Sequence, residues 1–324
     1  MTQLKEITAS AEWSAPSNLA IVKYWGKKGV QEPLNPSISF SLKHSKTTTR
    51  VKATPAEEPG FDFHLDGKPQ PAFNEKIGQF LDKIRPYLPF LRNHHLHINS
   101  SNTFPHSSGI ASSASSMAAL ALCLVRLHNI SQGKQDDPID LMMASGLARL
   151  GSGSASRSVY GGWTLWGKQT PVKESSDMYA IAIGNEQVHP VFSDLRNAIL
   201  LIDPGKKGVS STLGHQLMEN HPYREARIQQ ARQNTVKLLE TLKTGNWDDF
   251  TEIAENEALS LHGLMMSSTP SYTLLHPNSL AAITEIRNMR KSSELQVCFS
   301  MDAGPNIHLL YPKKEEVKVK NWIE

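Results

Sequence analysis

The sequence predicts a mixed α+β protein that is built in two halves. In the first half, segments that alternate apolar or β-branched residues with polar ones come before segments with helical spacing. Residues 184–190, which contain Asn and Pro, separate this half from a second one that begins with its own apolar strand. Because 324 residues suffice for two domains or for one large domain with a deep cleft, we expect domains at residues 1–188 and 189–324.

The composition is typical of a soluble enzyme. The 34 basic and 31 acidic residues give a formal charge of +3, which is too balanced to indicate nucleic-acid binding but still allows attraction of an anionic substrate. Cys123 and Cys298 lie far apart in apolar contexts, as buried free thiols of a reducing compartment do. The N-terminus lacks a signal peptide, and no run approaches the roughly 20 apolar residues of a membrane span. We therefore expect a cytoplasmic protein with neither nucleic acid nor membrane as a partner.

Strands dominate the start of the chain. Residues 12–26 contain an apolar, strand-like run that breaks at Gly26. Residues 37–42 and 47–53 alternate as two half-buried antiparallel strands would, and residues 61–67 add a strand and a turn.

Helical patterns follow these strands. Residues 73–87 have helical spacing, and a helix rich in small residues should run from Pro138, which follows two aspartates, to Gly151. A second small-residue loop then leads into a strand with Trp163 and Trp166. The remaining expected elements are strands at 95–98, 180–183 and 198–202, helices at 224–242 and 247–264, and two strands within 297–311.

Residues 105–120, PHSSGIASSASSMAAL, predict an anion site. Gly109 allows a close approach of the backbone to a ligand, and a helix at 114–127 would direct the unpaired amides of its first turn and the positive end of its dipole towards the loop. The hydroxyls beside these amides would come from Ser107, Ser108, Ser112 and Ser113. The segment matches neither the P-loop nor the dinucleotide pattern, and the alternative is an ordinary serine-rich helix cap.

Three types of charged residue are candidates for chemistry. Asp302 lies at a tight turn between two apolar strands, where a rigid, partly desolvated carboxylate can accept a proton, or where it can simply form the turn. Arg157 is flanked by small residues, so nothing bulky nearby would cover a guanidinium that grips a carboxylate or phosphate, although a surface arginine is the alternative. Lys23 and the pair Lys206 and Lys207 are further phosphate ligands or surface lysines.

Metal and hydrolase motifs are weak. His94, His95 and His97 alternate along a strand-like segment and would point to opposite faces, so we expect packed or solvated histidines instead of a metal site. GSGSA approaches the G-x-S-x-G nucleophile motif but has Ala155 in place of the second Gly.

Six ordered motifs carry a resemblance to a known family. APSNLAIVKYWGKK, NPSISFSL, PHSSGIASSAS, GSGSASRSVYGGW, KKGVSST and MDAGPN resemble motifs of the GHMP kinase superfamily and, within it, of the mevalonate diphosphate decarboxylases, over nearly the whole chain. The resemblance implies a two-domain GHMP kinase fold. Its N-terminal, ATP-binding half would be ribosomal-S5-like and its C-terminal half ferredoxin-like, with the active site in the cleft between them.

The resemblance also implies an activity, namely the ATP-dependent decarboxylation of mevalonate 5-diphosphate to isopentenyl diphosphate by a homodimer that uses Mg²⁺. Asp302 would accept the proton of the 3-hydroxyl group, Lys23 would fix that aspartate, and Arg157 would hold the substrate carboxylate. The other implied substrate ligands are Tyr24, Lys27, Ser152, Ser154, Ser210 and Ser211. The implied ATP ligands are Ser101, Asn102, Ser107, Ser108, Gly109, Ala111, Ser112, Ser113, Lys206 and Lys207, with Ser112 or Ser113 near a Mg²⁺ that keeps water and phosphate ligands.

Two departures from the family pattern leave alternatives open. His106, Ser107 and Ser108 stand where many members have Thr-Ala-Ala, and Thr212 stands where some bacterial members have an arginine beside the diphosphate. The alternatives are a decarboxylase of a mevalonate monophosphate, a kinase that does not decarboxylate, and a nucleotide-binding regulator without turnover.

Overall fold

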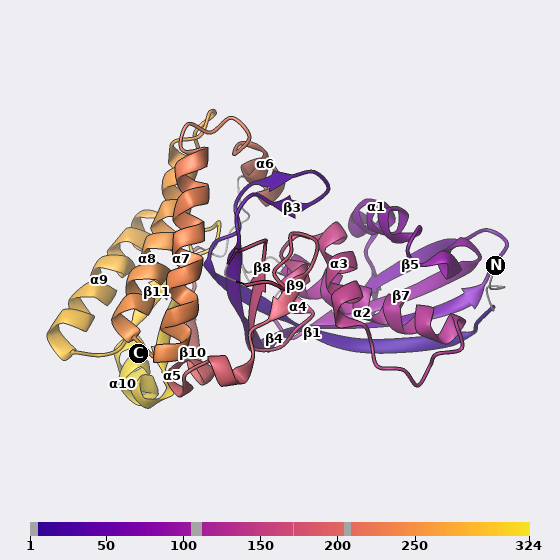
Figure 1. The fold of residues 1–324 in the computed structure, drawn as a ribbon, viewed down its shortest axis with the longest axis horizontal. Coiled ribbons are helices and arrows are strands. Elements are labelled where there is room, and N and C mark those ends of the chain that lie inside the picture. Colours follow the sequence, from indigo (N-terminus) through magenta and orange to yellow (C-terminus); the bar gives the residue numbers. More distant parts are fainter. Residues whose placement is uncertain (1–5, 105–111, 171, 204–208) are drawn as a thin grey trace.

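The structure is a computed structural model and describes residues 6–104, 112–170, 172–203 and 209–324. Its largest sheet has seven strands in the order β6-β5-β7-β4-β8-β9, with β1 paired to β4, and helices α1 to α3 lie over one of its faces (Figure 1). The strands are β1 (Ala9–Val22), β4 (Ser37–Pro55), β5 (Gly60–Leu65), β6 (Lys68–Pro69), β7 (His94–Asn102), β8 (Trp163–Trp166) and β9 (Ala180–Ala182). A separate hairpin joins β2 (Lys27–Lys28) to β3 (Glu32–Pro33).

The two separate strands predicted at 37–42 and 47–53 are wrong, because both belong to the single 19-residue strand β4. The first part of β4 pairs with β8 and the later part with β7, while β1 pairs along both parts. The polar residues 43–46 therefore do not end the strand, since the neighbouring strands supply hydrogen-bond partners on either side of them. β1 and β4 consequently form a long ribbon that runs through the molecule (Figure 1).

The helices of this part are α1 (Asn74–Ile84), α2 (Ser112–Ser131), α3 (Leu141–Gly151) and the short α4 (Ala155–Ser158). The predicted start of α3 at Pro138 is wrong. Its first residue is Leu141, because the side chain of Asp140 accepts a hydrogen bond from the Met143 N–H at 2.9 Å and so caps the helix. The end at Gly151 is as predicted, whereas α4 occupies part of the segment that was expected to be a loop.

Helix α2 corrects the expectation about membrane spans. It has the length and composition of a spanning helix, with a mean hydropathy of 1.2 over 18 residues, yet 67% of that window is buried inside the protein. The helix carries apolar residues on all its sides because it packs against β1, β4 and α3 at the same time. Its composition therefore fits a core helix.

The second part of the chain combines a three-stranded sheet with long helices. The sheet has the order β10-β12-β11, formed by β10 (Leu195–Leu200), β12 (Ile307–Pro312) and β11 (Cys298–Ser300). Helices α7 (Arg224–Thr244), α8 (Trp247–Met266) and α9 (Pro277–Ser293) lie side by side at one end of the molecule (Figure 1). The sequence predicted α7 and α8 but not α9. The shorter helices are α5 (Pro190–Ser193), α6 (Ser211–Gln216) and α10 (Glu316–Ile323).

The two parts share a core where the β1–β4 ribbon meets α7 and α8. Leu19 and Ile38 of the ribbon belong to the same buried cluster as Leu238 of α7 and Phe250 of α8. This shared packing fixes the end of β1, at Val22, against the helices of the second part. Cys123 and Cys298 are buried free thiols, as expected.

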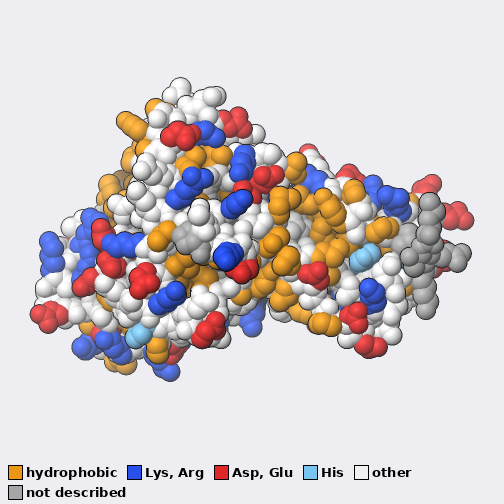
Figure 2. All heavy atoms as spheres, viewed as in Figure 1, with side chains coloured by type: hydrophobic (Ala, Val, Ile, Leu, Met, Phe, Trp, Pro, Cys, Tyr) orange, Lys and Arg blue, Asp and Glu red, His pale blue; other side chains and the backbone are white. Residues whose placement is uncertain are grey.

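The histidines of β7 only partly follow the prediction. His94 is buried and accepts a hydrogen bond from the Ile7 N–H through Nε2, whereas His95 and His97 are half-buried on the other face. The expected opposite faces hold for His94 against the other two, but residues two apart in a strand point the same way, so His95 and His97 share a face. Elsewhere, acidic and basic side chains are interspersed over the face in Figure 2.

Candidate active site

A cleft of about 780 Å³ lies where β1 ends, and it is bordered by α1, the starts of α2 and α6, the α3–α4 connection and the β11–β12 turn. Its volume suits a small-molecule ligand. The cleft collects ten of the residues that the sequence indicated, from both halves of the chain. They are Lys23, Tyr24, Lys27, Ser112, Ser113, Ser152, Ser154, Arg157, Ser211 and Asp302.

Some indicated residues lie elsewhere. Ser101 is exposed on β7, and Asn102 accepts a hydrogen bond from the Thr47 hydroxyl at 2.7 Å, so neither lines the cleft. Ser210 caps α6 by accepting a hydrogen bond from the Leu213 N–H. Ser107, Ser108, Gly109, Ala111, Lys206 and Lys207 fall outside the described residues.

Lys23 and Asp302 form an ion pair at the base of the cleft. The Lys23 Nζ lies 2.9 Å from Asp302 Oδ1 and donates to the Ala20 carbonyl at 2.6 Å. Lys23 is 2% exposed and Asp302 32%, so the carboxylate faces the cleft while the ammonium group supports it from inside the protein. Burial lowers the pKa of Lys23, and Asp302 and Glu257 counteract this effect by stabilising its charged form.

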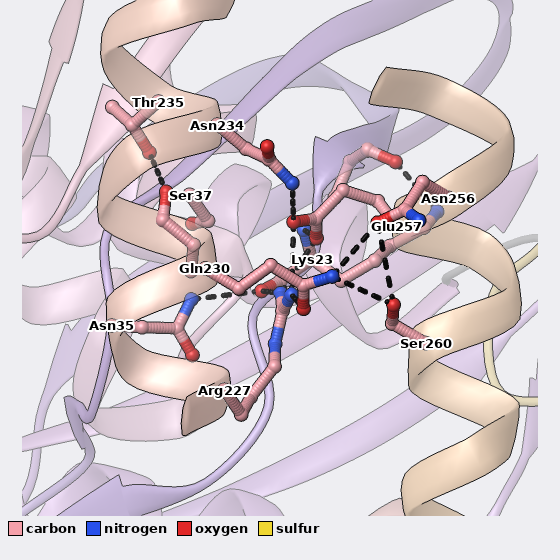
Figure 3. Close-up of polar contacts among 12 residues, drawn as sticks. Lys23, Asn35, Ser37, Arg227, Gln230, Asn234, Thr235, Asn256, Glu257 and Ser260 are labelled. Atoms are coloured by element: carbon pink, nitrogen blue, oxygen red, sulfur yellow. Dashed lines mark hydrogen bonds and ion pairs between the residues drawn. The ribbon is translucent and has the colours of Figure 1, made fainter. Parts of the chain in front are cut away.

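The backbone of Lys23 is clamped by α7 and α8 (Figure 3). Its N–H donates to Glu257 Oε2 at 2.8 Å, and its carbonyl accepts from Arg227 Nη2 and Asn35 Nδ2, each at 2.9 Å. Arg227 and Glu257 are bound to each other through two hydrogen bonds of 2.6 and 2.8 Å. Asn234 donates a further hydrogen bond to Glu257 at 2.7 Å. Since both ions are buried and the terminal nitrogens of Arg227 and both carboxylate oxygens of Glu257 are hydrogen-bonded, this clamp holds Lys23 rigidly.

Arg157 is buried on α4 and lines the cleft. Trp166 lies over its guanidinium at 5.9 Å, which contradicts the expectation that nothing bulky covers this group. Asn18 accepts from Nε and Nη2, and Ser37 accepts from Nη1 at 2.6 Å. These bonds use three of the five guanidinium N–H groups and leave one on each terminal nitrogen for a bidentate ligand. Burial lowers the pKa of Arg157 to about 10, so it stays charged at neutral pH.

Hydroxyl groups line the cleft between these charges. The hydroxyl oxygen of Ser113, at the start of α2, lies 3.4 Å from that of Ser152. The hydroxyl oxygen of Ser152 in turn lies 3.4 Å from that of Ser154. The Tyr24 hydroxyl is buried and has no hydrogen-bond partner within the described part of the chain. A buried polar atom of this kind normally has a partner, which a polar ligand in the cleft would supply.

Basic residues of α1 complete the cleft and were missed from the sequence. Lys76, Gln79 and Lys83 line it together with Lys27, and their spacing along the helix places them on one face. The polar residues at this helical spacing were the feature of the sequence that could have identified them. Desolvation lowers the pKa of Lys27, and the charges of Lys83 and Lys76 lower it further, so a bound anion would relieve this repulsion.

The charge of the cleft favours an anionic ligand. Among the described lining residues, five are basic, namely Lys23, Lys27, Lys76, Lys83 and Arg157, and one is acidic, Asp302. His215, also missed, accepts a hydrogen bond from the Gly26 N–H at 2.9 Å between the rings of Tyr24 and Trp25. Burial lowers the pKa of His215 to about 3, so it is neutral there. The arrangement can therefore hold phosphates and a carboxylate around one supported proton acceptor.

Comparisons with known proteins agree with this geometry. Residues 15–180 match the model of the diphosphomevalonate decarboxylase-like N-terminal domain, and residues 198–324 match that of the mevalonate 5-diphosphate decarboxylase C-terminal domain. The diphosphomevalonate decarboxylase of Ganoderma lucidum is 30% identical over 328 residues, which cover 94% of this chain and 78% of that protein.

Solved structures share the fold over both parts of the chain. The crystal structure of mevalonate diphosphate decarboxylase from Staphylococcus aureus superimposes with a TM-score of 0.85 at 28% identity, covering 97% of this chain and 91% of that one. A structure described as MDDEF in complex with MVAPP, AMPPCP and magnesium gives a TM-score of 0.83 at 30% identity, with coverages of 98% and 93%. The predicted two-domain GHMP kinase-type fold is confirmed.

Proposed function

Because this chain belongs to the diphosphomevalonate decarboxylase family, we propose that Asp302, Lys23 and Arg157 carry out the family's reaction in the cleft. The protein is an enzyme that decarboxylates mevalonate 5-diphosphate in an ATP-dependent reaction of the mevalonate pathway. The observation that carries the assignment of roles is the cleft itself, which is lined by a half-buried carboxylate, the buried lysine paired with it and a buried arginine.

In the first step, the 3-hydroxyl oxygen of the substrate forms a bond to the γ-phosphorus of ATP, and the bond from that phosphorus to ADP breaks. Asp302 accepts the hydroxyl proton, since its carboxylate is the acidic group among the described residues that line the cleft. Lys23 keeps this carboxylate in place through the 2.9 Å contact and offsets negative charge that develops next to it.

In the second step, the C1–C2 bond breaks, its electrons form the C2–C3 double bond, and the phosphate on C3 leaves. Arg157 binds the C1 carboxylate with its two remaining terminal N–H groups, which keeps the breaking bond aligned with the departing phosphate. Asn18, Ser37 and Trp166 hold the guanidinium in that orientation. The products are carbon dioxide, phosphate, ADP and isopentenyl diphosphate.

ATP and Mg²⁺ are the proposed co-substrate and metal. The first turn of α2, with Ser112 and Ser113 at its start, supplies hydroxyls and unpaired amides for the triphosphate, and the lysines of α1 supply countercharge. Mg²⁺, when bound, neutralises phosphate charge while water and phosphate oxygens fill most of its coordination sphere. The described lining residues fit this role, because they offer serine hydroxyls and no cluster of carboxylates.

The experiment that tests this proposal incubates the protein with ATP and Mg²⁺ and either mevalonate 5-diphosphate or mevalonate 5-phosphate. We expect equal amounts of carbon dioxide and phosphate from the diphosphate. Release of carbon dioxide and phosphate from mevalonate 5-phosphate alone would show that the monophosphate, and not the diphosphate, is the substrate. ATP hydrolysis without carbon dioxide, or binding without turnover, would instead favour a kinase or a regulator.

Further assignments stay predictions: the domain division and the location rest on the composition and patterns of the sequence, and the homodimer rests on the family resemblance. We propose a domain division at residue 188, a homodimer and a cytoplasmic location, with neither nucleic acid nor membrane as a partner. Light scattering on the purified protein measures the mass of the particle, and a monomer mass at micromolar concentration would contradict the homodimer.

A further inference from the structure

A cluster of metal-ligating side chains lies outside the cleft, on the face of the large sheet that β5 and β7 share. These two strands run parallel, with Asp62 directly opposite His97 and Gly60 opposite His95. Leu96 and Ile98 of β7 are buried in the core below, so His95 and His97 both project from the outer face next to Asp62. None of the three lines the cleft.

The ligand atoms of this cluster converge on one point. Asp62 Oδ2 lies 2.5 Å from His97 Nδ1 and 3.2 Å from His95 Nε2, and the three ligand atoms all lie within 4.8 Å of one another. The Nδ1 atom of His64 lies 3.4 Å from the other oxygen of Asp62. Two imidazole nitrogens and one carboxylate oxygen are a set of ligand atoms that divalent transition metals use.

The spacing suits a metal ion after a small adjustment. Bonds of about 2.0–2.2 Å in a tetrahedral site place neighbouring ligand atoms about 3.4 Å apart. The distance from His95 Nε2 to Asp62 Oδ2 is already close to this value. A rotation of the half-buried His97 side chain that moves its Nδ1 by about 1 Å would lengthen the shorter distance to Asp62 Oδ2 to the same value. This adjustment involves a side chain only, so the Cα positions that the β5–β7 pairing sets can stay as they are.

The chemistry of the donors selects the kind of ion. Imidazole nitrogen favours Zn²⁺, Cu²⁺ and Ni²⁺ over Mg²⁺, which prefers oxygen ligands. Lys52 on β4 lies opposite His97 and opposes cation binding, while the negative charge of Asp62 compensates for it. We propose that Asp62, His95 and His97 form a binding site for Zn²⁺, with the fourth position open to water or His64.

Such an ion would cross-link β5 to β7. β5 pairs with β7 along its whole length, but on its other side it pairs only at His64 and Leu65 with the two-residue strand β6. An ion that binds the folded protein and not the unfolded chain raises the unfolding temperature, and the increase grows with the logarithm of the free ion concentration above the Kd. The site is thus a stabilising site that is independent of the proposed catalytic roles.

The test uses the full-length protein without a polyhistidine tag, stripped of metal and titrated with ZnCl₂ in a calorimeter in excess Mg²⁺. We expect binding of one Zn²⁺ per chain, weakened at least tenfold in Asp62→Asn and in His97→Asn. His44→Asn, which changes an exposed histidine of β4, is the matched control and should bind as the unchanged protein does.

A second measurement separates loss of the site from loss of folding. Zn²⁺ should raise the unfolding temperature of the unchanged protein and of His44→Asn, but not that of the double variant Asp62→Asn with His97→Asn, whose metal-free unfolding should remain cooperative. Absence of Zn²⁺ binding to the unchanged protein, or equal binding by the double variant, would overturn the proposal.

Discussion

The position of Asp302 at the β11–β12 turn gives one side chain two possible roles, because an aspartate at such a turn can also serve the backbone alone. Its contact with the buried ammonium of Lys23, and its place in a cleft that is otherwise basic, favour the catalytic role. A carboxylate that only formed a turn would not need a buried countercharge from Lys23, which directly follows β1 and lies 279 residues earlier in the chain.

Replacing Asp302 with Asn should therefore lower kcat by about 10² to 10⁴, the usual contribution of a general base, and leave ATP affinity nearly unchanged. Steady-state kinetics and titration with a fluorescent ATP analogue measure the two effects. Asp66→Asn, which alters an aspartate in the turn between β5 and β6, is the control and should keep normal turnover. Near-normal turnover of Asp302→Asn would return this residue to a turn-forming role.

His215 makes stability depend on pH. Burial lowers its pKa to about 3 in the folded protein, against an ordinary value of about 6.5 in the unfolded chain. Below pH 6.5 the unfolded chain binds a proton that the folded protein excludes, so stability falls as the pH is lowered from 6.5 towards 3. Protonation of Nδ1 would also remove the acceptor for the Gly26 N–H.

We expect this residue to account for a loss of about 2 kcal/mol of unfolding free energy between pH 7 and pH 5. In His215→Asn, whose amide oxygen can accept the same hydrogen bond without titrating, the loss should be smaller by that amount. Urea unfolding at both pH values measures the difference, with the exposed His44→Asn as the control. Identical pH dependence of His215→Asn and the unchanged protein would refute the assignment.

At the scale of elements, helices α7 and α8 act on the site through the backbone of Lys23, since neither Arg227 nor Glu257 lines the cleft. Glu257 and Arg227 hold the backbone of Lys23, and the charge of Glu257 also stabilises the protonated lysine. Glu257 is therefore a positioning residue, whose influence on the reaction passes through Lys23.

In Glu257→Gln, the pKa of Lys23 should fall, because burial still disfavours its charge and one counteracting carboxylate is lost. The basic limb of the kcat profile should move to lower pH, and removal of one partner of a buried ion pair should cost about 3 kcal/mol or more of stability. Glu255→Gln is a matched control on the same helix, since Glu255 is also buried but pairs with Arg287 and Arg290, away from Lys23.

Kinetics across pH and urea unfolding distinguish the two variants. Both should lose stability, but only Glu257→Gln should shift the basic limb. If the two variants have the same pH profile, Glu257 has a purely structural role.

At the scale of the whole molecule, the cleft joins residues of both parts of the chain. Arg157 and the start of α2 belong to the part with the large sheet, whereas Asp302 lies in the turn between two strands of the three-stranded sheet. This split motivates the hypothesis that relative movement of the two parts closes the site around both ligands.

Small-angle scattering tests this movement. The protein with substrate and a non-hydrolysable ATP analogue should have a smaller radius of gyration than the free protein, because closure excludes water from the cleft. The ATP analogue alone is the control for ligand binding without a complete site. Indistinguishable scattering of the free and doubly bound protein would contradict closure.

Local patterns predicted much of the fold. An apolar run identified residues in β1, alternation identified residues in β4, and helical spacing identified residues in α1, because these patterns lie in consecutive residues. Residues of β5, α7 and α8 were also predicted. One error arose because distant partners decide the outcome: β4 is continuous because β1 pairs along both of its parts. The other error was local, since α3 begins after its cap at Asp140 and not at Pro138.

The sequence by itself determined the residue types that carry the chemistry, since Lys23, Arg157 and Asp302 stand in recognisable motifs. Only the tertiary structure decided what surrounds them. The clamp on Lys23 joins residues 234 positions apart, and the basic face of α1 and the group of Asp62, His95 and His97 arise from packing and strand register. The physical reason is that periodicity and motifs are local, whereas contacts between distant segments depend on how the whole chain packs.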